Sequence, residues 1–257
     1  MIRFEKVTKY FGERKVLDDV NLTIEAQETF VIVGFSGAGK SVTLKHIIRL
    51  LTPDEGRVFI GDDAISEAMG RDLERLREQF GVLFQGAALL EWLSVGENVA
   101  LPLRERTTMT DAEIERRVRE KLELVNLPDV INALPSELSG GMRKRVGLAR
   151  AIVMNPQIIL YDEPTSGLDP VTSRAIDQLI DRMRQELKVT SVVVTHDLFS
   201  ALAIGSRIAM ISDGRIIELA NPQGFIQSQN GVVKSFLDAQ YITKRGAWER
   251  DSHETHK

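Results

Sequence analysis

Eight consecutive residues match the pattern G-x-x-x-x-G-K-[ST] of a phosphate-binding P-loop. They are Gly34, Phe35, Ser36, Gly37, Ala38, Gly39, Lys40 and Ser41, with Val42 following directly. Backbone N–H groups of such a loop, and the helix start behind it, present positive partial charge to phosphates. Lys40 adds a full positive charge at the β- and γ-phosphates, and the Ser41 hydroxyl suits Mg²⁺, which prefers oxygen ligands. The motif therefore predicts a site for nucleotide phosphates with Mg²⁺.

Four further polar residues stand where buried strands are predicted to end: Gln85, Asp162, Glu163 and His196. Ligands of α/β folds bind at this edge of the sheet. Asp162 can hold Mg²⁺ through water, while Glu163 can orient and deprotonate an attacking water. Gln85 can reach Mg²⁺ or that water, although a glutamine is also a common polar strand end. A lone histidine is usually structural, but His196 shares the strand-end position of the others.

A second anion site is predicted where Ser139, Gly140 and Gly141 precede a helix over residues 143–153. This site has no cationic residue of its own, and two phosphate sites in one chain make sense if the second serves another subunit. Asp169 is predicted as the N-cap of a later helix, with a proline at its first position.

Elements that must position these residues can be read from periodicity and turn residues. An apolar run over 29–33 predicts a buried strand before the P-loop, and helical spacing of apolar residues follows it. Short strands are predicted in residues 2–24, with turns at 12–13 and 18–19. Phe11 would then lie at a hairpin tip, where it either stacks on an adenine ring or belongs to the core.

The middle and the end of the chain leave two alternatives open. The apolar run over residues 89–101, which includes Trp92, is either core or a docking surface for a partner. A helix over 231–241 is predicted to turn Val232 inward. The polar stretch after it favours a disordered end, against which stands Trp248, a candidate anchor.

Composition bounds the class of protein. The 257 residues, 43% hydrophobic and 27% charged, suit one large or two small globular domains. A net charge of −4 gives no general attraction to nucleic acid, so we expect no nucleic-acid partner. The absence of cysteine fits a reducing compartment. The N-terminal residues do not resemble a signal peptide, and no apolar run approaches the roughly 18 residues that span a bilayer. We expect a soluble protein whose membrane role goes through a partner.

Taken in order, these motifs resemble the ATPase subunit of ABC transporters over about residues 1–222. The resemblance implies an α/β fold, with a RecA-like P-loop NTPase core, an N-terminal antiparallel β subdomain and an inserted α-helical signature subdomain. The core would comprise residues 1–86 and 157–222, the helical subdomain 87–156, and a C-terminal helix and tail 223–257. It also implies ATP hydrolysis with Mg²⁺. Phe11, the P-loop residues, Val42, Gln85, Ser139, Gly140, Gly141 and Asp169 would contact nucleotide; Ser41, Gln85 and Asp162 would serve the metal; Glu163 and His196 would be catalytic.

Two residues depart from the family pattern. Phe35 replaces the usual proline after the first P-loop glycine, and Val42 stands where a threonine commonly contacts the α-phosphate. Neither change affects Lys40, Ser41 or the glycines, so we expect hydrolysis to survive.

Within the family, residues 83–90, 98–104, 138–142 and 236–238 are similar to the ATPase of Mla-type (maintenance of lipid asymmetry) phospholipid transporters. In that group a methionine, here Met142, is usual after the signature glycines. The resemblance implies a head-to-tail homodimer with two shared ATP sites, peripheral on the cytoplasmic face of the inner membrane. Implied partners are a membrane permease dimer, a lipid-carrying MCE-type protein and a small STAS-like regulatory subunit. An amino acid or metal chelate as cargo, and a soluble ABC ATPase acting on ribosomes or DNA, remain as alternatives.

Overall fold

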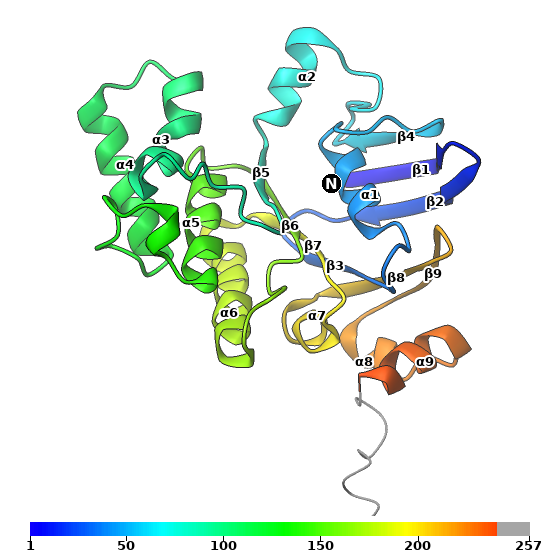
Figure 1. Ribbon diagram of the computed structural model, residues 1–257. Helices are drawn as coiled ribbons and strands as arrows, with labels where there is room; N and C mark the ends of the chain where they lie inside the picture. Colours follow the sequence, from blue (N-terminus) through cyan, green and yellow to red (C-terminus); the bar gives the residue numbers. More distant parts are fainter. Residues whose placement is uncertain (241–257) are drawn as a thin grey trace, which may run out of the picture.

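The computed structural model describes residues 1–240 (Figure 1). Residues 241–257, which include Trp248, lie outside the described part of the chain, so the two alternatives for that segment stay open.

A six-stranded sheet in the order β5-β6-β7-β3-β8-β9 forms the centre of the fold (Figure 1). Its strands are β3 (Thr29–Val33), β5 (Phe80–Leu83), β6 (Ile158–Asp162), β7 (Thr190–Val194), β8 (Arg207–Ser212) and β9 (Arg215–Ala220). The first five in this order pair in parallel, and β9 pairs antiparallel with β8. Parallel strands bring their carboxyl ends to one edge, so the residues that follow β3, β5, β6 and β7 converge there.

Both faces of this sheet are buried, because side chains alternate between two apolar clusters. On β3, Val31 and Val33 face the cluster formed with helices α3–α7 and α9, whereas Phe30 and Ile32 face the cluster formed with α1, α2 and the second sheet. The continuous apolar run over 29–33 is thereby explained.

A separate three-stranded antiparallel sheet has the order β2-β1-β4, from β1 (Ile2–Phe11), β2 (Arg14–Ile24) and β4 (Glu55–Ile60). The turn predicted at residues 12–13 is confirmed as the β1–β2 hairpin. The turn predicted at 18–19 is wrong: both residues lie inside β2, where Asp19 has a φ of 50°. The pairing of β1 with β2 shifts register nearby, between Val7 and Lys9, so the polar pair marks an irregularity rather than a chain reversal.

The helices cover the two sheets as Figure 1 shows, with α3, α4 and α5 gathered at the side away from the antiparallel sheet. Their bounds are α1 (Lys40–Ile47), α2 (Gly70–Arg77), α3 (Val95–Arg106), α4 (Asp111–Leu124), η1 (Pro135–Glu137), α5 (Gly140–Ile152), α6 (Pro170–Leu187), α7 (Leu198–Ile204), α8 (Pro222–Ile226) and α9 (Gly231–Ala239). The signature helix begins at Gly140, not at Arg143, because Ser139 is its N-cap and accepts from the Met142 N–H at 3.3 Å.

The apolar run over 89–101 divides between the two alternatives. Val95 and Val99 are buried on α3 and belong to the core. Trp92, in the segment before α3, is 76% exposed and is therefore not a core residue. On α9, Val233, Phe236 and Leu237 are buried as predicted, but Val232 is exposed, so its inward placement was wrong. No helix within residues 1–240 is long and apolar enough to cross a membrane.

Candidate functional site

The P-loop joins β3 to α1 and follows a path that only glycine allows at two positions. Gly34 has a φ of 155°, and a Cβ there would lie 2.3 Å from the Ile211 carbonyl oxygen of β8. Gly39 has a φ of 110°, and a Cβ there would lie 2.9 Å from the Val16 carbonyl oxygen of β2. Strands of both sheets therefore pack closely against the loop. This packing holds the loop backbone in the conformation that presents N–H groups to an anion.

Lys40 begins α1 and is buried beneath this loop. Its Nζ donates to the carbonyl oxygens of Gly34 at 2.8 Å and Phe35 at 3.1 Å. Burial lowers the pKa of Lys40, and the nearby charges of Glu163 and Asp162 oppose that shift. A cation held at the loop by two neutral carbonyl groups can exchange them for phosphate oxygens, which fits a nucleotide.

The Ser41 hydroxyl donates to Asp162 Oδ1 at 2.9 Å, which brings together two oxygen ligands from α1 and the end of β6. Residues 1–240 contain no cluster of three or more His, Cys, Asp or Glu side chains that could hold a metal alone. Mg²⁺ typically takes one or two carboxylates plus substrate phosphates. Ser41 and Asp162 therefore fit a magnesium that is bound together with nucleotide phosphates.

Glu163 and His196, predicted separately, are in direct contact: His196 Nδ1 lies 2.8 Å from Glu163 Oε2. Glu163 has a φ of 49°, in the left-handed region that is uncommon for such a residue, and its N–H donates to the Val194 carbonyl at 2.8 Å. The carboxylate is thus aimed from one strand end toward the next. An oriented carboxylate beside an imidazole can hold and deprotonate a water molecule.

Gln85 follows β5, and its side-chain amide lies 3.4 Å from the Ser166 hydroxyl. Its backbone carbonyl accepts from Lys144 Nζ, a short contact, and the same Nζ donates to the Glu163 carbonyl at 3.0 Å. Burial lowers the pKa of Lys144, again against the charges of Glu163 and Asp162. The charges of Asp162 and Glu163 therefore act on two buried lysines, of which only Lys40 was predicted as a site residue.

One cavity of about 610 Å³ brings eight of the eighteen predicted site residues together. It is lined by Gly34, Phe35, Ser36, Lys40, Ser41, Gln85, Glu163, His196, Phe236, Ala239 and Gln240. The last three come from α9 and the residue after it. Phe236 packs edge-on against Phe35 with ring centroids 5.1 Å apart, and Gln240 Nε2 donates to the His196 carbonyl at 2.7 Å. The C-terminal helix thus forms a wall of the site.

The signature residues are not brought into this cavity. Ser139 and Gly140 are exposed, and a Cβ on Gly141 would lie 2.4 Å from Thr172 Cγ2 at the start of α6. Asp169 caps α6 as predicted, accepting from the Val171 and Thr172 N–H groups at 3.0 Å each. These residues lie next to one another at the starts of α5 and α6, outside the lining of the P-loop cavity.

Phe11 lies at the β1–β2 hairpin tip and is 49% exposed, which excludes the core alternative. Arg14, its cross-strand partner, approaches the P-loop, since its Nη2 lies 3.4 Å from the Gly37 carbonyl oxygen. The hairpin tip therefore stands beside the phosphate loop, where an aromatic face is available for stacking.

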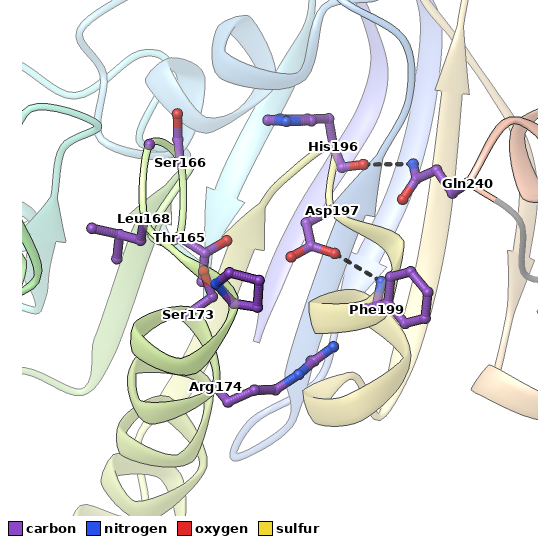
Figure 2. Close-up of a pocket in the computed structure, with 11 residues that line it drawn as sticks. Thr165, Ser166, Leu168, Ser173, Arg174, His196, Asp197, Phe199 and Gln240 are labelled. Carbon is purple, nitrogen blue, oxygen red and sulfur yellow. Dashed lines mark hydrogen bonds between the residues drawn. The ribbon is translucent and has the colours of Figure 1, made fainter.

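A second cavity, of about 630 Å³, is lined by residues at and before the starts of α6 and α7 and is shown in Figure 2. Arg174 extends from α6 toward α7, and Asp197 caps α7 by accepting from the Phe199 N–H. Beneath it, Ser200 Oγ lies 2.9 Å from both Asp197 Oδ2 and the buried Asp177 Oδ2. This network joins α6 to the helix directly after His196.

Asp177→Asn is expected to make the protein more resistant to rising pH. Burial raises the pKa of Asp177 to about 6 from 3.8, although Ser200 and Arg174 oppose the shift. The folded state then binds the proton more tightly, so stability is lost as pH rises from about 4 to about 6. The loss is on the order of 1–3 kcal/mol. Asparagine does not titrate, so the melting temperature of the Asp177→Asn variant relative to that of the wild type should rise across that pH window. A difference in melting temperature that stays constant from about pH 4 to about pH 6 would contradict this prediction.

Lys144 was not predicted as a site residue, and neither were the cavity residues Phe236, Ala239 and Gln240. Lys144 could have been found, because it shares one helix face with Gly141, Gly147 and Leu148, and a lysine on a buried face needs a partner. Gln240 carries no such signal, since its contacts are 42 and 44 residues away along the chain.

Comparisons with known proteins agree with this geometry. A sequence model of the ABC transporter family matches residues 17–166. The chain is 41% identical over 254 residues to the probable ribonucleotide transport ATP-binding protein mkl of Mycobacterium tuberculosis, covering 99% of this chain and 71% of that one. It is 38% identical over 247 residues to the methionine import ATP-binding protein MetN of Clostridioides difficile, covering 96% of this chain and 77% of that protein.

Among solved structures, the chain resembles an ATP-binding cassette solved as a dimer in a post-hydrolysis state with ADP and Pi. The TM-score is 0.79 at 37% identity, over 86% of this chain and 99% of that one. The α/β fold, with its antiparallel β subdomain and P-loop core, is confirmed by this likeness.

Proposed function

Because this chain belongs to the ABC transporter family and is an ATPase that uses ATP with Mg²⁺, we propose that it works as a homodimer with shared ATP sites. Each site would combine Lys40 and the P-loop of one subunit with Ser139, Gly140 and Gly141 of the other. One observation carries this proposal: the cavity that holds Lys40, Glu163 and His196 contains none of the signature residues. In the proposed dimer, the signature surface of one copy contacts the nucleotide that is bound at the P-loop of the other copy.

The proposed roles follow from the contacts. Lys40 and the loop N–H groups bind phosphate oxygens, and Phe11 stacks on the base. Ser41 and Asp162 would hold the magnesium, and the metal would supply neutralisation of the phosphate charge. Glu163 takes the proton of the attacking water, and His196, 2.8 Å from its carboxylate, fixes its orientation.

Gln85 and Asp169 complete the proposed set. Gln85, in the loop after β5, would contact the nucleotide and reach the magnesium or the attacking water. Asp169 orders the turn beside the partner-facing signature through its cap of α6. We assign α3–α5, within residues 87–156, to a helical subdomain that carries the signature, and residues 1–86 and 157–222 to the nucleotide-binding core.

We further propose phospholipid as the cargo, with a membrane permease dimer, an MCE-type lipid carrier and a STAS-like subunit as partners on the cytoplasmic face of the inner membrane. Support comes from the four stretches that resemble Mla-type ATPases. The names of the relatives point to ribonucleotide and methionine in those proteins, which keeps an amino acid or another small solute as the second candidate.

The test is to identify the proteins that co-purify with this chain from detergent-solubilised membranes, and to measure phosphate release by that complex. Phospholipid vesicles should stimulate hydrolysis if the cargo is lipid. Stimulation by an amino acid, with no lipid effect, would move the cargo to the second candidate.

Trp92→Ala is expected to weaken assembly with the permease. Trp92 is exposed just before α3, in the loop that starts at Gln85, and a large exposed indole is typical of an interface anchor. Losing such an anchor costs about 2 kcal/mol or more, or roughly 30-fold in affinity. Ile226→Ala, another exposed apolar residue on the distant α8, is the matched control (Figure 1). Equal recovery of permease with both variants would remove Trp92 from the interface.

A further inference from the structure

Lys144 is a buried cation that contacts no side-chain carboxylate among the hydrogen bonds and ion pairs of residues 1–240. Its Nζ instead donates to two backbone carbonyl groups, those of Gln85 and Glu163. A buried ammonium is costly unless it is paired or well hydrogen-bonded, and such a cost is tolerated where the group does something specific. The two carbonyls belong to the loop that carries Gln85 and to the strained turn that aims the Glu163 carboxylate.

The helix that carries Lys144 reaches the same loop a second time. Arg150, also on α5, donates to the carbonyl oxygens of Ala87 and Ala88, each at 2.7 Å. Both alanines have positive φ values, 59° and 49°. The backbone after β5 is therefore held in an uncommon conformation by two cations of one helix.

Helix α5 also begins at the signature residues, so it connects them to these contacts. Its first residues are the signature glycines, with Ser139 as N-cap, and Lys144 lies five residues farther along the same rigid element. A displacement at Ser139 must therefore move Lys144, and with it the two carbonyls that it joins.

We propose that Lys144 is a positioning residue that connects the signature helix to the hydrolysis site of its own subunit. Through its bonds to their backbone carbonyls, it fixes the positions of Gln85 and Glu163 relative to each other. This inference rests on the proposed function, because it takes Ser139 to contact the nucleotide of the other subunit. Occupation of one site then aligns the carboxylate that acts at the other.

The experiment compares ATP hydrolysis and ATP affinity of full-length Lys144→Met with wild type. Methionine is one atom shorter and keeps the apolar, unbranched character of the stem, but it removes every donor. We expect kcat to fall about 10–100-fold, the range for a misplaced catalytic group. The Kd of a fluorescent ATP analogue should change less than about twofold, because Lys144 does not line the P-loop cavity.

Lys121→Met is the matched control. Lys121 is also a buried lysine, 4% exposed, on the neighbouring helix α4, but its Nζ pairs with Glu120 and does not reach the site. Both variants should lose thermal stability, and only Lys144→Met should lose kcat. Lys144→Arg, which keeps charge and two parallel donors, should recover most of the activity. Lys144→Gln, one atom shorter and neutral, gives a second reading if the methionine variant fails to fold, with a loss of the same sign.

Three results would overturn the inference: wild-type kcat in Lys144→Met, an equal kcat loss in Lys121→Met that follows melting temperature, or loss of ATP affinity by the same factor as kcat. Ser139→Arg is measured alongside. If that variant hydrolyses ATP at the wild-type rate, the shared site on which the inference rests fails whatever Lys144→Met does. If it is silent while Lys144→Met is unimpaired, only the role of Lys144 is lost.

Discussion

Glu163→Gln should reduce ATP hydrolysis by at least about 100-fold, the low end for loss of a general base. Glutamine keeps the size and hydrogen bonding of the side chain but cannot take a proton from water. The backbone bond to Val194 should persist because the substitution leaves it untouched. The remaining side-chain oxygen of glutamine can take the place of Glu163 Oε2 beside His196 Nδ1. ATP binding should therefore be unchanged, and the ATP-bound dimer should accumulate. Phosphate release and analytical sedimentation measure the two effects.

The matched control is Glu186→Gln, the same chemical change at an exposed position near the end of α6. It should hydrolyse ATP at the wild-type rate. Turnover by Glu163→Gln close to that of the control would remove Glu163 from the role of base.

Lys40→Ala and Ser139→Arg should each abolish hydrolysis, but for different reasons. Lys40→Ala removes the buried cation of the P-loop, so nucleotide affinity itself should fall. Ser139→Arg leaves the P-loop cavity intact, because Ser139 does not line it, and places a bulky cation on the surface that would meet the partner's nucleotide. That variant should bind ATP and fail to turn it over. Equal loss of ATP affinity in both variants would contradict separate surfaces.

Mixing these two silent variants distinguishes a shared site from a site within one chain. In a mixed dimer, one shared site carries both lesions, while the other pairs an intact P-loop with an intact signature. Some hydrolysis should return, measured as rate against mixing ratio with the permease present to hold the dimer. A same-chain arrangement leaves one lesion in every site and predicts no recovery.

What the sequence predicted of this site is what local backbone chemistry determines. The glycines at 34 and 39 are required by the φ values of their own residues, and Asp169 caps the helix that starts beside it. Strand ends could be located because buried strands are short apolar runs, and parallel pairing then brings Gln85, Asp162 and His196 to one edge. These three residues are far apart in the sequence, but the parallel strand order brings them together.

The misses have physical reasons too. Helix α3 was not predicted because Pro102 interrupts its pattern, although the capping box of Ser94 and Glu97 marks its start. Two consecutive aspartates at 18 and 19 predict a turn, but β2 continues through them with an irregular register. Val232 was misplaced because a nine-residue helix gives too few apolar positions to fix its buried face. Gln240 acts through backbone groups of distant residues, which no spacing in the sequence reveals. Lys144 was missed although its place on the buried face of α5 could have indicated it.

The shared site can be tested most directly by crosslinking, because the chain has no cysteine and any introduced thiol is unique. Ser36→Cys in the P-loop and Ser139→Cys in the signature are placed in one chain that also carries Glu163→Gln to hold ATP. With ATP and a short bis-maleimide, the account predicts a crosslinked dimer joined between position 36 of one copy and position 139 of the other. A crosslink confined to the monomer, or none with ATP bound, would contradict it.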